Sequence, residues 1–123
     1  MVNYFGASAQ TRQYIGELFD LNPEDMNSQD WELVCADPGL ITSLIFQLKE
    51  KSNNPEVKHA VAALLVYSAY FDYRENLGNS RVIEVRKALE PDSKLINAMK
   101  GFWKNSANFK SETVLDFTRV LFE

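Results

Sequence analysis

The residues from Ala60 to Phe71 read AVAALLVYSAYF and form the longest apolar segment of this chain. Only Ser68 interrupts its apolar character, so a helix over these residues would have almost no polar face. A helix of that kind usually lies in the middle of a bundle, surrounded by other helices. The stretch is too short to cross a bilayer, which needs about 20 apolar residues. The sequence therefore predicts a buried central helix over about 55–76, opened by Asn54-Pro55.

Outward from this helix, the apolar residues on both sides mostly recur at helical spacing. Asp37-Pro38 opens a helix that buries Leu40, Ile41, Leu44, Ile45 and Leu48 and ends in Lys49-Glu50-Lys51. Pro91 ends one helix and can open the next. Segment 81–89 fits a helix or a strand, and we predict a helix because no second strand-like segment is present to pair with it. The other predicted helices have these inner faces: Thr11, Tyr14, Ile15, Leu18 and Phe19 within 9–20, capped by Ser8; Trp31, Val34 and Cys35; Leu95, Ile96, Met99, Phe102 and Trp103; and Val114, Phe117, Leu121 and Phe122, capped by Ser111.

These helices predict an all-α fold, an irregular or orthogonal bundle of six or seven short helices around the central one. The length of 123 residues fits one domain spanning 1–123. Composition agrees with a globular chain, because 46% of the residues are hydrophobic and 24% are charged. A single cysteine excludes an internal disulfide and fits a reducing compartment. The N-terminus lacks the basic start and apolar run of a signal peptide, so we expect a cytoplasmic protein.

The charges are distributed unevenly along the chain. From Gln13 to Leu48 there is no Lys or Arg, although the net charge of the whole chain is only −4. This segment holds seven acidic residues, which are Glu17, Asp20, Glu24, Asp25, Asp30, Glu32 and Asp37. Such a segment would attract a basic partner and speed its encounter, and it would repel nucleic acid. It also carries Tyr14, Met26 and Trp31, which are residue types enriched at protein interfaces.

Basic residues further along the chain form at most a modest stripe. They lie on two neighbouring predicted helices and are Arg81, Arg86, Lys87, Lys94, Lys100 and Lys104. Glu84, Glu90 and Asp92 are interleaved with them. A protein that binds the phosphate backbone normally shows a concentrated positive surface. We therefore predict no nucleic-acid partner.

No motif in the chain predicts a catalytic, metal or cofactor site. His59 is the only histidine, and its Glu56-x-x-His59 spacing would need a second such pair for a di-iron centre. Cys35 lies on a predicted apolar face beside Asp37, which would raise rather than lower a thiol pKa. We therefore expect a non-enzymatic protein without cofactor or metal. A small enzyme would need more titratable groups than one His and one Cys supply.

In overall profile the chain resembles small bacterial immunity proteins, most nearly those of contact-dependent growth inhibition systems. The seven acidic residues between Gln13 and Leu48 carry the resemblance, together with a compact and helical character. It implies that these acids bind a basic, nuclease-like toxin domain and neutralise it by covering its active site. The alternative hypothesis is a helical adaptor or regulator that binds a partner helix or peptide in an apolar groove. The sequence leaves the oligomeric state open.

Overall fold

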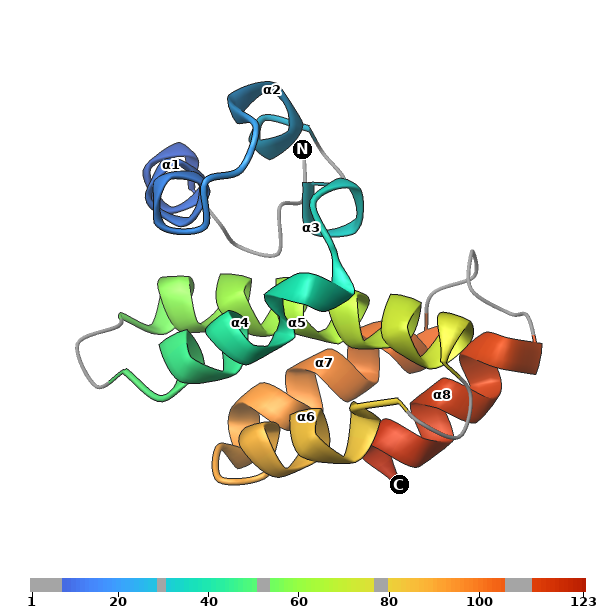
Figure 1. Ribbon diagram of the computed structural model, residues 1–123. Coiled ribbons are helices and arrows are strands. Elements are labelled where there is room, and N and C mark those ends of the chain that lie inside the picture. Colours follow the sequence, from blue (N-terminus) through green and yellow to red (C-terminus); the bar gives the residue numbers. More distant parts are fainter. Residues whose placement is uncertain (1–7, 29–30, 51–53, 77–79, 106–111) are drawn as a thin grey trace.

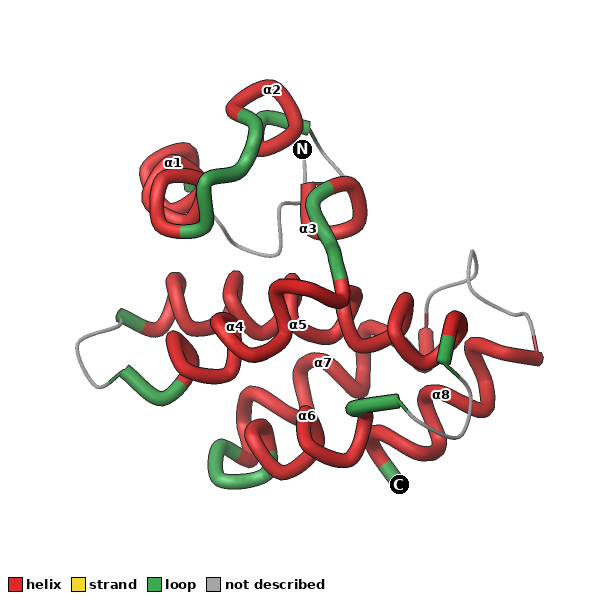
Figure 2. The backbone as a smooth tube through the Cα atoms, viewed as in Figure 1, coloured by secondary structure: helices red, strands yellow, loops and turns green. Residues whose placement is uncertain are grey.

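The computed structural model describes residues 8–28, 31–50, 54–76, 80–105 and 112–123, and every regular element in these ranges is a helix (Figure 2). This confirms the all-α fold and the helix over 81–89. In chain order the elements are α1 (Ala9–Leu18), α2 (Pro23–Met26), α3 (Trp31–Val34), the 3-10 helix η1 (Pro38–Leu40), α4 (Ile41–Leu48), α5 (Pro55–Glu75), α6 (Val82–Leu89), α7 (Ser93–Asn105) and α8 (Glu112–Phe122). None of the helices in the described ranges is long and apolar enough to span a bilayer.

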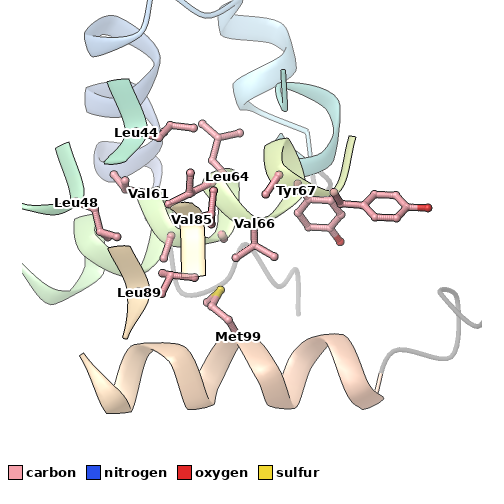
Figure 3. Packing of buried hydrophobic residues seen from close by; sticks show 14 of the residues in the cluster. Leu44, Leu48, Val61, Leu64, Val66, Tyr67, Val85, Leu89 and Met99 are labelled. Carbon is pink, nitrogen blue, oxygen red and sulfur yellow. The ribbon is translucent and has the colours of Figure 1, made fainter. Parts of the chain in front are cut away.

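The central position of α5 is also confirmed. Every residue from Ala60 to Tyr70 is buried, and α5 contacts α1, α3, α4, α6, α7 and α8. In Figure 1, helices α1 to α3 lie on one side of α5, α6 to α8 lie on the other, and α4 runs alongside it. Figure 3 shows where these layers meet: Leu44 and Leu48 of α4, Val85 and Leu89 of α6, and Met99 of α7 surround side chains of α5.

Aromatic side chains join α5 to the two C-terminal helices. The ring of Phe117 on α8 lies 5.4 Å from the ring of Tyr70 on α5 and 5.3 Å from that of Trp103 on α7, measured between centroids. Both contacts have the edge-to-face geometry that aromatic pairs prefer. Phe117 is fully buried, so this cluster anchors α7 and α8 to the central helix.

Side chains cap several helices at the expected start signals. The side-chain oxygen of Asn54 accepts a hydrogen bond of 2.8 Å from the backbone N–H of Val57, and Ser8 caps α1 in the same way through Thr11. At α7 the cap is Asp92, whose Oδ1 accepts a bond of 3.1 Å from the N–H of Leu95. Pro91 therefore ends the preceding segment but does not open α7. The predicted cap Ser111 lies outside the described residues.

One short helix was missed by the periodicity. Asn22-Pro23 breaks the amphipathic pattern of α1, yet Asn22 also caps α2 by accepting a 2.8 Å hydrogen bond from the N–H of Glu24. A helix of one turn is too short to show a repeating apolar pattern. The described ranges consequently hold eight α-helices, six of them long, against the predicted six or seven.

The inner face of α1 also differs from its prediction. Ile15 and Thr11 are buried as expected, but Tyr14 is 45% exposed and Leu18 is 43% exposed. Arg12 and Gly16 are buried in their place. The reason lies in α2, because a Cβ atom on Gly16 would stand 3.1 Å from Cγ of Met26. The absence of a side chain at Gly16 lets α2 approach α1 on this flank, which leaves Tyr14 and Leu18 outside.

Candidate functional site

The seven acidic residues expected at a binding surface lie in different environments. Glu17, Asp20, Glu24 and Asp37 are exposed, and Asp25 is partly buried. Glu32 is only 4% exposed, because α3 packs against both α2 and α5, so this carboxylate is not part of the surface. Asp30 lies outside the described residues. We use the name acidic surface for Glu17, Asp20, Glu24 and Asp25, the four carboxylates on or directly after α1 and on α2.

Glu17 and Asp20 line the same groove between α1 and α2. The groove has a volume of about 510 Å³, and Gly16, Leu21 and Met26 contribute apolar lining. Asp20 follows α1 with a φ of 54°, in the left-handed region that reverses the chain toward α2. Arg12, which is largely buried, also lines the groove, whose two carboxylates outnumber this one cation. A cationic side chain that entered this groove would find apolar surface for its aliphatic stem and a net negative charge for its head group.

Asp25 and Glu32 also raise the pKa of the Cys35 thiol. The pKa of Cys35 is raised to about 11, chiefly by burial and then by the negative charges of Asp25 and Glu32. Its Sγ lies 3.6 Å from Sδ of Met26. The thiol therefore stays protonated at neutral pH, which agrees in direction with the sequence analysis. The carboxylates that raise its pKa are Asp25 and Glu32, whereas Asp37 was expected.

Asp37 has a structural role at the other end of this segment. Its Oδ1 accepts a hydrogen bond of 2.8 Å from the N–H of Gly39, which caps η1. Its own backbone N–H donates a bond of 3.1 Å to Oγ of Ser68 in the middle of α5. These two bonds hold the chain where it passes from α3 to η1, so the backbone of Asp37 belongs to the framework of the fold.

The carboxylates of the acidic surface are not neutralised by ion pairs. Within the described ranges, no Lys or Arg forms an ion pair with Glu17, Asp20, Glu24 or Asp25. The ion pairs that the structure shows join residues of α5 to α8, namely Lys58–Asp92 at 2.9 Å, Arg81–Glu84 at 2.8 Å, Arg86–Glu90 at 3.1 Å and Arg119–Asp116 at 3.5 Å. Four carboxylates of the C-terminal half are thus paired locally, whereas the four carboxylates of the acidic surface have no ion pair with a described residue.

Arg12 is a residue whose role the sequence analysis missed. It is the only cation before Lys49, yet it is only 8% exposed. Its Nη1 donates a hydrogen bond of 3.2 Å to the backbone carbonyl of Met26, which ties α1 to α2. Arg12 also lines the groove that Glu17 and Asp20 line, so its positive charge offsets part of their negative charge. The apolar periodicity of residues 9–20 does not include Arg12, so the sequence did not predict that this residue is buried.

Of the three interface-type residues in the acidic segment, only Tyr14 is available to a partner. Trp31 is fully buried and Met26 is 3% exposed, so both serve the core. Tyr14 lies one turn before Leu18 on α1, and both side chains are substantially exposed. Glu17 precedes Leu18 directly. An aromatic ring, an aliphatic side chain and a carboxylate therefore share one stretch of helix surface.

Glu56 and His59, the pair considered for a metal site, lie in different environments. Oε1 of Glu56 accepts a hydrogen bond from the backbone N–H of Ser8, which lowers the pKa of this carboxyl and ties the start of α1 to α5. Burial lowers the pKa of His59, which is half-buried near the start of α5. Among the residues that the structure describes, no group of three or more His, Cys, Asp or Glu is placed to hold a metal ion.

Comparisons with protein-family models, with curated proteins and with solved structures found no match for this chain.

Proposed function

We propose that this chain is a non-enzymatic protein-binding inhibitor whose acidic surface covers a basic partner domain. More specifically, we propose that this chain is an immunity protein that neutralises a nuclease-like toxin domain. The observation that carries the proposal is that, among the residues that the structure describes, no ion pair involves Glu17, Asp20, Glu24 or Asp25, whereas Glu84, Glu90, Asp92 and Asp116 are each paired. Unpaired carboxylates on adjacent elements create a local negative potential that accelerates association with a basic protein.

Side chains beside these acids supply the apolar contacts that such a complex needs. Interfaces derive much of their affinity from a few large side chains, with Tyr prominent among them. Tyr14 and Leu18 are exposed on α1, and the groove beside Glu17 and Asp20 offers apolar lining at Met26 and Leu21. An arginine or lysine of the partner that enters the groove would be recognised by its stem as well as by its charge.

The test compares two variants that change the net charge by the same amount. The first, Glu17→Gln/Asp20→Asn/Glu24→Gln, neutralises three carboxylates of the acidic surface. The matched control, Glu75→Gln/Glu90→Gln/Asp116→Asn, neutralises three exposed carboxylates on α5, after α6 and on α8. Each tagged protein is first shown to be folded by circular dichroism. It is then used to capture partners from the native host lysate at low salt and is eluted with a salt gradient.

We expect the wild type and the control to retain one basic protein that elutes as salt rises, because screening weakens exposed charge pairs. The first variant should bind the purified partner at least about tenfold more weakly, since close charge pairs at interfaces are worth more than 1 kcal/mol each. If that partner is toxic when expressed alone, co-expression of this chain should restore growth.

Other outcomes would contradict the proposal. Equal binding by both variants would remove the acidic surface from the interface. A partner retained at high salt would favour the adaptor hypothesis, and Phe46 on α4, which is 70% exposed, would be the first side chain to substitute. A captured partner whose activity is unchanged by an excess of this chain would exclude inhibition.

A further inference from the structure

A second charged site lies in the C-terminal half of the molecule, away from the groove between α1 and α2. The end of α4, the start of α5, and the turn between α6 and α7 come together at the same end of the bundle (Figure 1). They enclose a hollow of about 570 Å³ that is lined by Lys49, Lys58, Lys87 and Lys94. A second hollow of about 430 Å³ shares Lys58 and Lys94 with the first and adds His59.

Positive charge exceeds negative charge around the larger hollow. Its lining contains four lysines but only two carboxylates, Glu50 and Asp92. Asp92 is committed to the fold, because one of its oxygens lies 2.9 Å from Nζ of Lys58 and the other caps α7. The same contacts, led by the Lys58 hydrogen bond, lower the pKa of Asp92 and keep it ionised. Asp92 therefore balances Lys58 and leaves the other three lysines to Glu50.

The three remaining lysines are not paired within the hollow. In the described part of the chain, Lys49, Lys87 and Lys94 form no ion pair. Lys49 also lies near Glu84, but that carboxylate is already held by Arg81 at 2.8 Å. Like charges that converge from three elements repel one another, and a bound anion would relieve this repulsion. Lysine ammonium groups commonly serve as point charges that bind phosphate.

We propose that this hollow binds a small phosphate-bearing anion, such as a phosphate or diphosphate group of a metabolite. The size of the hollow suits a small molecule, and the carboxylates of Glu50 and Asp92 at its margin disfavour a continuous nucleic-acid backbone. The site is independent of the acidic surface, and the proposal does not rest on the proposed inhibitory function.

His59 provides a single-site reporter for the test, because it is the only histidine in the chain. The imidazole signals of the full chain are followed by NMR as a function of pH, with and without pyrophosphate, at ionic strength held constant with NaCl. We expect pyrophosphate to raise the pKa of His59 by roughly 0.5 unit, since a nearby anion favours the imidazolium form. The shift should saturate, with a dissociation constant below about 1 mM, as several charge-assisted contacts would allow.

Substitutions then locate the site. Lys87→Gln and Lys94→Gln should each weaken pyrophosphate binding at least about fivefold, whereas Lys100→Gln, which removes a charge from α7 outside the hollow, should leave it unchanged. Three results would overturn the proposal: no saturable effect beyond that of NaCl, equal weakening by all three substitutions, or far tighter binding of a short single-stranded oligonucleotide than of pyrophosphate. The first would show that the hollow binds no anion specifically, the second would indicate an adventitious ion only, and the third a nucleic-acid site.

Discussion

The backbone N–H of Asp37 donates a hydrogen bond of 3.1 Å to Oγ of Ser68, a side chain that is completely buried in the middle of α5. This bond joins the segment between α3 and η1 to the central helix. Ser68 is the one polar interruption in the apolar stretch from Ala60 to Phe71. Its hydroxyl is thereby explained, because a buried polar group is stable only when it is hydrogen-bonded.

Replacing this serine should therefore destabilise the protein. Ser68→Ala removes the acceptor of the Asp37 N–H, a loss of about 1–2 kcal/mol, offset by a few tenths of a kcal/mol because alanine favours helix more than serine. We expect a net decrease of about 1 kcal/mol in the free energy of unfolding, measured by urea denaturation. Hydrogen exchange should accelerate most in α3 and η1, next to the lost bond.

Ser43→Ala is the matched control for this substitution. Ser43 is an exposed serine on α4 whose side chain forms no hydrogen bond with a described residue, so its replacement has the same helix-propensity gain and no lost side-chain contact. We expect this variant to be as stable as the wild type or slightly more stable. Equal stability of the two alanine variants would show that the Ser68–Asp37 bond contributes nothing measurable.

The central helix could be predicted from the sequence because its signal is local and long. An apolar run with a single polar residue needs burial on all sides, whichever helices cover it. The packing of α1 could not be predicted in the same way, since its orientation depends on α2. Gly16 allows the close approach of Met26, and Arg12 finds its acceptor on that residue's carbonyl, 14 positions further along the chain. Periodicity alone cannot detect such long-range partners.

The candidate site was predictable only as a charge imbalance. The absence of cations from Gln13 to Leu48 is visible in the sequence, but the separation of exposed from buried acids is not. Glu32 follows the buried Trp31 in a helix of one turn, and packing of that helix against α2 and α5 removes it from the surface. The four lysines of the larger hollow lie on α5, α6 and α7 and directly after α4, so their convergence is a property of the fold.

The backbone conformation of Asp20 leads to a second prediction about stability. Asp20 is the only non-glycine residue with positive φ among the described residues, at 54°, and it follows Phe19, the C-cap of α1. The N–H of the next residue, Leu21, donates a 2.8 Å hydrogen bond to the carbonyl of Gly16, so the chain closes α1 as glycine-ended helices do. We expect Asp20→Gly to raise the free energy of unfolding by about 0.5–1 kcal/mol, because glycine adopts this conformation without a steric cost.

Two further substitutions at Asp20 separate backbone strain from charge. Asp20→Asn keeps a side chain that tolerates positive φ and removes a negative charge from the unfavourable end of the α1 dipole, for a gain of about 0.3 kcal/mol. Asp20→Ala should instead cost about 1 kcal/mol. Thermal or urea denaturation should therefore rank the variants glycine, asparagine, aspartate and alanine from most to least stable. An alanine variant as stable as the glycine variant would contradict the conformational argument.

The raised pKa of Cys35 predicts a slow and strongly pH-dependent thiol. Only the thiolate attacks an alkylating reagent, and a pKa near 11 leaves about one thiol in a thousand ionised at pH 8. Alkylation by iodoacetamide should therefore be at least about tenfold slower than in the urea-unfolded chain, and it should accelerate about tenfold per pH unit up to pH 10. Because the unfolded thiol loses its proton near pH 9 while the native thiol keeps it, this group's contribution to stability is full below pH 9 and is lost as the pH rises toward 11.

Asp25→Asn tests the electrostatic part of this shift. The substitution removes one of the two negative charges that raise the pKa of Cys35 but leaves the larger effect of burial, so alkylation at pH 8 should accelerate by a few-fold and remain slower than in the unfolded chain. Glu24→Gln is the control, since it neutralises the neighbouring carboxylate of α2, which has no such influence on the thiol. A native alkylation rate that levels off near pH 8 would show that Cys35 ionises readily, and it would reopen the question of a reactive thiol in this protein.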